Sequence, residues 1–218
     1  LWIEAIERKG VLVFHASRIP LEGFRGLAVQ HETAPFVLLN GGDSPDARTF
    51  TLLHELCHLA LGENDWSHEE IASGELLSSD QQTESWCNRV AAELVLPKDE
   101  LRNRADSFDS IGLEEVRRLA SAFNVSTYAT AIRLHRLGLT DGQTVALAAK
   151  AARRASRGSG GGNWYRNQLR NLRRRYTATV LDALSSGRIT KRTASGLLGA
   201  RKSDGIEKMR AECQTPRR

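Results

Sequence analysis

The stretch FTLLHELCHLALG (Phe50–Gly62) places two histidines and a glutamate inside the apolar stripe of a predicted helix. Residues four apart share one face of an α-helix, so the imidazoles of His54 and His58 can reach a single ion. A catalytic zinc site takes three protein ligands and leaves one position for water. Glu55 lies about 100° around the helix from His54, where it can take a proton from that water. The pattern H-E-x-x-H therefore predicts a hydrolytic metal site with Glu55 as the base.

The third ligand is predicted to come from a later helix. The longer pattern H-E-x-x-H-x-x-G-x-x-H fails here, because Leu61 replaces its glycine and Asn64 replaces its third histidine. A glutamate from a second helix is the other common solution. Glu84 follows in the segment TESWCNRVAAELVLP, on a helical face that is small and apolar beyond its first turn. The other residues on this face are Asn88, Ala91 and Val95.

Several other side chains could compete with Glu84 for this role. His68 is the strongest competitor, because it lies in the polar segment between the two helices. The same segment also holds Asp65, Glu69 and Glu70. Glu93 and Glu100 lie off the packing face or beyond Pro97, so we expect them to be solvated.

The segments before Phe50 predict a small β-sheet and the start of the histidine helix. Three β-branched and aromatic runs are bounded by turn residues. They are VLVFHAS (11–17), GLAVQ (26–30) and APFVLLN (34–40), and a helix that ends at Gly10 precedes them. Ser44 suits the N-cap of the histidine helix, Pro45 its first position and Gly62 its end.

Further helices are predicted after the polar segment 63–79. They cover about 80–96, 113–122 and 126–137. The stretch RRASRGSGGGN (153–163) is the clearest linker in the chain. Beyond it, the spacing of four apolar residues predicts one amphipathic helix, and Thr190 can cap another short one. The four residues are Tyr165, Leu169, Leu172 and Tyr176.

Together, the paired motifs resemble the ImmA/IrrE family of bacterial metallopeptidases over roughly Val11–Gly138. The resemblance rests on the H-E-L-x-H-L helix, a short polar connection and E-x-x-x-N-x-x-A-x-x-L-x-x-P. It implies that His54 and His58 bind zinc, that Glu84 is the third ligand and that Glu55 is catalytic. The chain departs from the family in two cysteines near these ligands. Cys57 stands where the family commonly has glycine, and Cys87 where alanine is common.

The two thiols allow two interpretations. Small buried thiols can fill space between the two helices, and this is the interpretation that we favour. A thiol beside His58 and another one turn from Glu84 could also be sensitive to oxidation or compete for the metal.

Composition and charge limit the class of protein. The 218 residues are 40% hydrophobic, enough for a core, and no run of 18 apolar residues predicts a membrane span. Three widely spaced cysteines do not make a disulfide framework, which favours a reducing cytoplasm. Residues 1–150 hold 14 Lys and Arg against 22 Asp and Glu, whereas residues 151–218 hold 17 against 4. We therefore expect an acidic body and a basic C-terminal segment with separate tasks.

Two helical segments could bind nucleic acid. Residues 113–139 have the spacing of a helix-turn-helix, whose second helix would present Tyr128, Arg133 and Arg136. However, residues 106–139 carry four arginines and four acids, whereas phosphate binding needs a positive excess. We therefore interpret this pair as a support for the metal site that could also position a protein substrate.

The basic C-terminal segment is the better candidate for a charged partner. Four of its arginines are predicted to share the helical face opposite the apolar stripe: Arg166, Arg170, Arg173 and Arg174. Nucleic acid or an acidic protein could bind there, although a solvated face on a docked helix explains the same pattern. Binding that weakens steeply with salt would support nucleic acid.

The sequence predicts an α+β fold, in which a small β-sheet packs on a zincin-like helical core. Further helices and a helical C-terminal tail follow. The predicted domains are a metallopeptidase domain, a helix-turn-helix-like pair, a linker and a basic helical segment. Their respective ranges are 1–104, 105–140, 141–163 and 164–218.

The predicted function is that of a cytoplasmic zinc-dependent endopeptidase with one zinc ion, which manganese could replace. By the family resemblance, its substrate is a helix-turn-helix transcriptional repressor, whose cleavage derepresses stress-response or mobile-element genes. The alternative is a catalytically silent, metal-stabilised regulatory or antitoxin-like protein that binds through the helical pair and the basic tail. An intact Glu55 favours the enzyme, because a structural zinc site needs no base.

Overall fold

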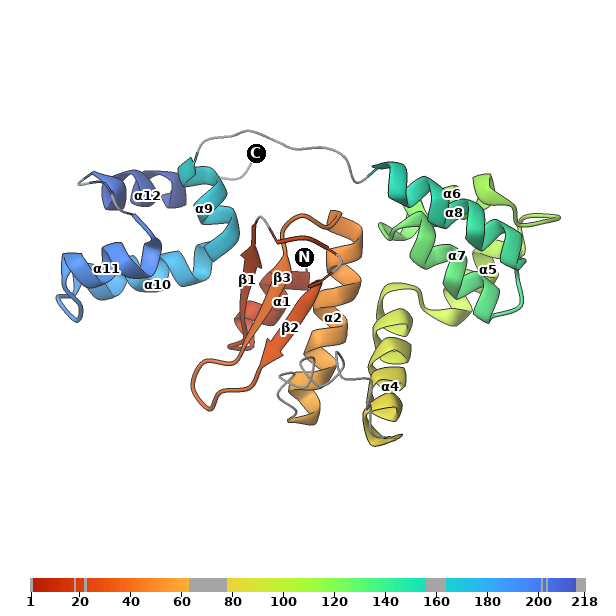
Figure 1. Ribbon diagram of the computed structural model, residues 1–218, viewed down its shortest axis with the longest axis horizontal. Coiled ribbons are helices and arrows are strands. Elements are labelled where there is room, and N and C mark those ends of the chain that lie inside the picture. Colours follow the sequence, from red (N-terminus) through yellow and green to blue (C-terminus); the bar gives the residue numbers. More distant parts are fainter. Residues whose placement is uncertain are drawn as a thin grey trace.

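The protein has an α+β fold (Figure 1). The computed structural model describes residues 2–17, 19–21, 23–62, 78–155, 164–200, 202 and 204–214. Within these ranges the chain forms a three-stranded sheet and eleven helices. The predicted fold class, α+β, is therefore confirmed. None of the helices described there combines the length and the apolar composition that crossing a bilayer requires.

The sheet is mixed and has the strand order β1-β3-β2. Its strands are β1 (Leu12–Ala16), β2 (Gly26–Val29) and β3 (Phe36–Asn40). β1 runs parallel to β3, and β2 runs antiparallel to β3 on the other side. Alternate side chains of β1 and β3 are buried, which is the period-two pattern of a sheet with one covered face. The three predicted strands are therefore confirmed.

The histidine-bearing segment forms α2 (Pro45–Leu61), which packs against β2 and β3. The Ser44 hydroxyl accepts a hydrogen bond from the Ala47 backbone N–H at 3.2 Å, and Gly62 ends the helix with a φ of 75°. α1 (Trp2–Arg8) packs against β1. Both ends of α2 therefore lie where the sequence places them.

The next helices continue from the far side of α2. α4 (Ser78–Val95) lies beside α2 (Figure 1). The remaining members of this part are α5 (Lys98–Ala105), α6 (Leu113–Phe123), α7 (Thr127–Arg136) and α8 (Gly142–Ala155). The polar segment that the sequence places between α2 and α4 lies outside the described residues at 63–77.

α5 and α8 are helices that the sequence analysis did not predict. Pro97 ends α4, and it also occupies the N-cap position of α5 with a φ of −55°, close to the helical value. α8 occupies most of the predicted linker 141–163, because its alanine-rich sequence favours a helix and Ala148 is fully buried against the core. Residues 156–163 of that linker lie outside the described residues.

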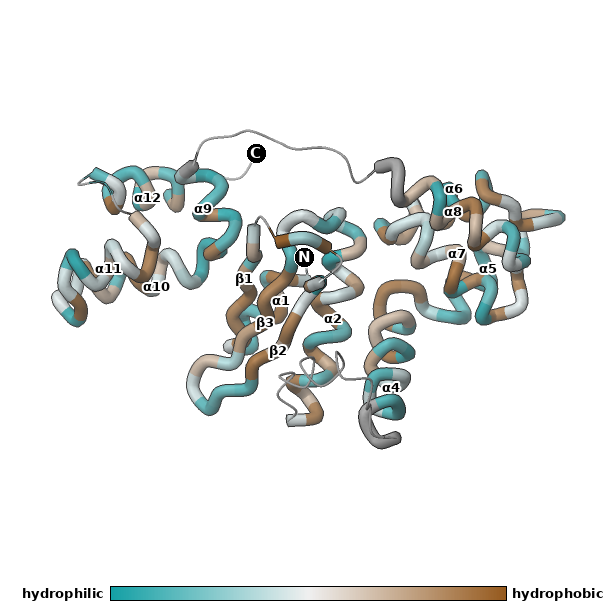
Figure 2. The backbone as a smooth tube through the Cα atoms, in the orientation of Figure 1, coloured by the Kyte–Doolittle hydropathy of each residue, from teal (hydrophilic) through white to brown (hydrophobic). Residues whose placement is uncertain are grey.

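The hydrophobic core is divided into two clusters. The first cluster lies between the sheet, α2 and the helices from α4 to α8. Figure 2 shows hydrophobic residues concentrated along the strands. The second lies within the four C-terminal helices and includes Val180, Leu181, Leu198, Ile206 and Met209. The predicted division into four domains stays a prediction.

The C-terminal helices are shorter than the sequence predicted. They are α9 (Trp164–Leu172), α10 (Arg174–Ser185), α11 (Lys191–Leu198) and α12 (Gly205–Gln214). The prediction of one continuous helix from Tyr165 to Tyr176 was wrong. Arg173 has a φ of 63°, and this turn of the backbone divides the segment into α9 and α10. The four apolar residues of the predicted stripe still pack against the second cluster. Thr190 caps α11, as predicted.

The C-terminal helices, α9 to α12, dock on the β1 edge of the sheet (Figure 1). The ring of His15 contacts the Arg170 carbonyl oxygen through Nδ1 at 3.2 Å, and the Ser17 hydroxyl donates to Asn171 at 3.0 Å. The Phe14 and Tyr176 rings pack edge to face. Burial, reinforced by nearby arginines, lowers the pKa of His15 to about 4. Arg170 therefore contributes its backbone to this junction while the residue itself is exposed, and Arg173 is half-buried.

Candidate metal centre

Two of the predicted ligands lie in the middle of α2. His54 and His58 are one turn apart, and their rings pack edge to face with centroids 4.9 Å apart. Their Nε2 atoms lie 3.2 Å from each other. Because α2 is capped at both ends, this pair is held on a well-formed helix.

The third side chain comes from α4. Glu84 Oε2 lies 3.3 Å from His54 Nε2, and Glu84 Oε1 lies 3.2 Å from His58 Nε2. Small buried side chains on the facing helices, Cys57 on α2 and Ala91 on α4, allow this close approach. The structure thus brings His54, His58 and Glu84 together, and they could hold a metal ion.

The donor atoms of these three side chains lie as close together as the ligands of one metal ion. Ligands placed tetrahedrally at ~2.0–2.1 Å from a zinc ion lie about 3.3–3.4 Å from one another. The two imidazole Nε2 atoms lie 3.2 Å apart, and each lies 3.2 or 3.3 Å from one oxygen of the Glu84 carboxylate, a different oxygen for each ring. The donor set of two imidazoles and one carboxylate is also one that zinc accepts. The type and the closeness of the donors therefore suit a divalent ion.

The charge of the site suits a cation. Hydrogen bonds from His54 and His58 lower the pKa of the Glu84 carboxyl well below its usual range, while burial acts in the opposite direction. Glu84 is therefore ionised around neutral pH, the form in which a carboxylate binds a metal.

Glu55 lies beside the cluster of His54, His58 and Glu84, under the first residue of β2. Its side chain is buried, with 4% of the residue exposed. A Cβ atom added to Gly26 would lie 3.0 Å from Glu55 Oε1 and 2.5 Å from the Thr51 methyl carbon. The backbone of β2 therefore passes directly over Glu55, and only glycine leaves room for both side chains.

Of the other sequence-based candidates, only Glu93 and Glu100 lie within the described residues, and neither belongs to this cluster. His68, Asp65, Glu69 and Glu70 lie outside the described residues. Glu93 forms an ion pair with Arg133 and is largely exposed, as predicted. Cys57 and Cys87 are buried and reduced, and the Cys57 thiol donates to the Leu53 carbonyl oxygen at 3.2 Å.

Sequence reasoning did not identify two features around the site. The first is Gly26, whose role depends on the contact between β2 and α2 and has no local signal beyond a glycine at the start of a strand. The second is an open pocket along α4 and α7 that includes Arg89 and Arg136. From the sequence, Arg136 is a candidate only for a contact with nucleic acid.

Comparison with known proteins agrees with this geometry. The family model Peptidase_M78, described as the IrrE N-terminal-like domain, matches residues 6–135. No match to a curated protein was found. The match includes the sheet, α2, α4 and α6, and it confirms the resemblance to the ImmA/IrrE family. Because it covers more than half of the 218 residues, the chain belongs to the Peptidase_M78 family of IrrE N-terminal-like metallopeptidases.

Proposed function

We propose that this protein is a zinc-dependent endopeptidase that cleaves a helix-turn-helix transcriptional repressor. The observation that carries the proposal is the cluster of His54, His58 and Glu84, whose two imidazoles and one carboxylate lie close enough together to hold one zinc ion. A peptidase family implies a protein substrate. The repressor and the release of stress-response or mobile-element genes follow from the resemblance to the ImmA/IrrE family.

Three residues would hold the ion, and a fourth would move the proton. A zinc ion at this site supplies a Lewis acid that polarises the scissile carbonyl and acidifies water. Glu55 takes a proton from the attacking water and passes it to the nitrogen of the leaving amine. Its burial beneath β2 keeps the carboxylate out of bulk water and fixed in direction.

The outer strand β2 offers a place for the substrate backbone. Within the described residues, β2 pairs only with β3, so its other edge presents unpaired N–H and C=O groups. An extended peptide can add to such an edge as a further strand. Because Gly26 of β2 lies directly over Glu55, a peptide paired there would pass beside the proposed base.

The three cysteines support a cytoplasmic location. Cys57, Cys87 and Cys213 are all free thiols in the structure, the state expected in a reducing compartment. Zinc is the expected ion because of its preference for imidazole, and manganese could replace it.

The direct test of the proposal is the substitution Glu55→Gln. The isosteric amide cannot accept the proton but leaves the three ligands in place, so we expect one zinc ion per chain and no cleavage of a candidate repressor. Metal analysis and a gel-based cleavage assay measure the two properties. Glu32→Gln, at an exposed turn, serves as the control and should cleave like the wild type.

Two results would contradict the proposal. Cleavage by the zinc-loaded Glu55→Gln protein would remove Glu55 from its role. A wild-type protein that binds zinc but cleaves none of the candidate repressors would instead favour the metal-stabilised regulatory or antitoxin-like binding protein.

A further inference from the structure

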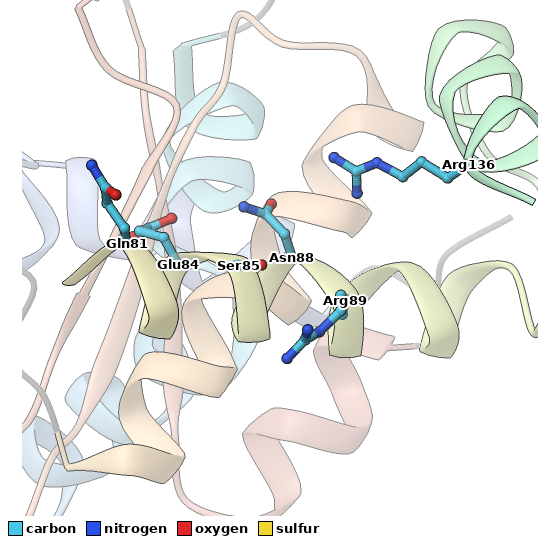
Figure 3. A pocket seen from close by; sticks show the side chains of 6 residues that line it. All are labelled: Gln81, Glu84, Ser85, Asn88, Arg89 and Arg136. Carbon is cyan, nitrogen blue, oxygen red and sulfur yellow. The ribbon is translucent and has the colours of Figure 1, made fainter. Parts of the chain in front are cut away.

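A pocket of about 490 Å³ adjoins the candidate metal centre along α4 (Figure 3). Five of its lining residues belong to α4, and Arg136 reaches in from α7. The five are Gln81, Glu84, Ser85, Asn88 and Arg89. Because Glu84 belongs both to the metal-binding cluster and to the pocket wall, a side chain bound in the pocket lies next to the reacting bond.

The pocket lining has a positive excess. Among the described lining residues Glu84 is the only acid, and that carboxylate is already held between the two imidazoles. Arg89 and Arg136 are both exposed and form no ion pair or hydrogen bond with any described residue. Figure 3 shows the Arg136 side chain extending from α7 toward Asn88, whose amide adds a neutral donor. Among the described residues, the pocket therefore presents two guanidinium groups without a carboxylate partner.

Arg136 is held in position by its neighbour on α7. The Arg133 guanidinium donates to the Leu96 carbonyl oxygen at 3.3 Å and forms an ion pair with Glu93, which ties α7 to the end of α4. Arg136 lies three residues later, on the same side of α7. The anchored helix thus points a second, unpaired guanidinium at the pocket.

We propose that this pocket binds an acidic side chain of the peptide substrate, with Arg136 as its main ligand. The inference rests on the proposed peptidase function and adds a substrate class to it: segments with aspartate or glutamate close to the scissile bond. A guanidinium presents a planar fork of donors that fits a carboxylate. Arg89, one residue beyond Asn88, adds a second positive charge at the pocket.

The test compares peptides that differ at one position. A mixed peptide library cleaved by the zinc-loaded protein identifies the position nearest the cut where Asp and Glu are enriched. Three peptides that carry Glu, Gln or Lys at that position are then assayed. We expect kcat/KM to be about 10- to 100-fold higher for Glu than for Gln, as for a charge-assisted pair.

Variants assign this preference to individual residues. Arg136→Ala should remove the preference for Glu over Gln, and Arg136→Glu should favour Lys. Arg89→Ala should reduce the preference in part. Arg118→Ala, at an exposed site on α6 outside the pocket, is the matched control and should keep the full preference.

A binding assay separates this inference from the proposed function. Fluorescein-labelled versions of the three peptides, or an alanine-rich series with the same substitutions, are titrated into zinc-loaded Glu55→Gln protein. Tighter binding of the Glu peptide that depends on Arg136 supports the pocket even if the wild type cleaves nothing. Two results overturn the inference without contradicting the proposed peptidase function. One is cleavage of the three peptides at equal rates, and the other is an Arg136→Ala protein whose kcat/KM falls equally for all three peptides.

Discussion

At the scale of single residues, the backbone of Gly26 packs tightly against the side chains of Thr51 and Glu55. An added methyl group would meet Thr51 at 2.5 Å and Glu55 at 3.0 Å, both closer than van der Waals contact. We therefore predict that Gly26→Ala displaces Glu55 and lowers kcat at least 10-fold, while zinc binding by His54, His58 and Glu84 is retained. Steady-state kinetics and metal analysis of the same preparation measure both effects.

Gly23→Ala is the matched control for this substitution. Gly23 precedes the same strand, and nothing lies within 4 Å of a Cβ atom built there. This variant should keep wild-type activity. If Gly26→Ala were equally active, β2 could not lie as close to Glu55 as the structure has it.

The residues of the candidate site differ in how far the sequence could predict them. His54, Glu55 and His58 are identified by local spacing, because helical geometry alone places them together. Glu84 needed the further assumption that its helix packs on α2, and the structure places its carboxylate within 3.3 Å of both imidazoles. Gly26 and Arg136 could not be assigned, since their roles depend on contacts between elements distant in sequence.

At the scale of elements, the packing of α4 on α2 sets the position of Glu84. Ala91 is fully buried two turns after Glu84 on the same face of α4. Ala91→Leu would overfill this contact, at a cost of about 1–3 kcal/mol in unfolding free energy, and would push the two helices apart. We predict that zinc affinity falls at least 10-fold, measured by competition with a chelator.

The control is Ala146→Leu, at an exposed position of α8, which should change neither stability nor zinc affinity much. An Ala91→Leu protein that is less stable but binds zinc as tightly as the wild type would show that helix spacing does not control the site.

The elements that the sequence predicted well are those with strong local signals at their ends. Ser44 and Gly62 define α2, and Ser126 caps α7 by accepting from the Ala129 backbone N–H. α8 was missed because a glycine-rich stretch follows it and the whole region was assigned to a linker. The break at Arg173 was also missed, since an arginine with positive φ carries no sequence signal.

At the scale of the whole molecule, the C-terminal helices and the metallopeptidase part meet around His15. The unfolded histidine titrates near 6.5, whereas burial holds the pKa of His15 at about 4. Between these values the unfolded state binds more protons, so stability falls as pH falls. We predict a loss of roughly 2 kcal/mol between pH 7 and pH 5 from this group alone, measured by urea unfolding.

His15→Gln removes this titration, so its stability should fall less over the same pH range. Equal pH dependence of the wild type and the His15→Gln protein would contradict the burial of His15 at this junction.

The sequence predicted a basic C-terminal segment but not where it docks. The hydrogen bond between His15 and Arg170 joins residues 155 positions apart, and no local pattern encodes such a contact. Arg170 contributes its carbonyl oxygen to the junction, whereas the residue is exposed, as expected for a solvated helical face.

The central claim is that one divalent ion binds between α2 and α4 through two imidazoles and one carboxylate. X-ray absorption spectroscopy of the zinc-loaded protein tests it most directly. We predict one zinc per chain with only nitrogen and oxygen neighbours at about 2.0–2.1 Å, two of them imidazoles. Sulfur neighbours at about 2.3 Å would place the ion on cysteine thiols and contradict the account.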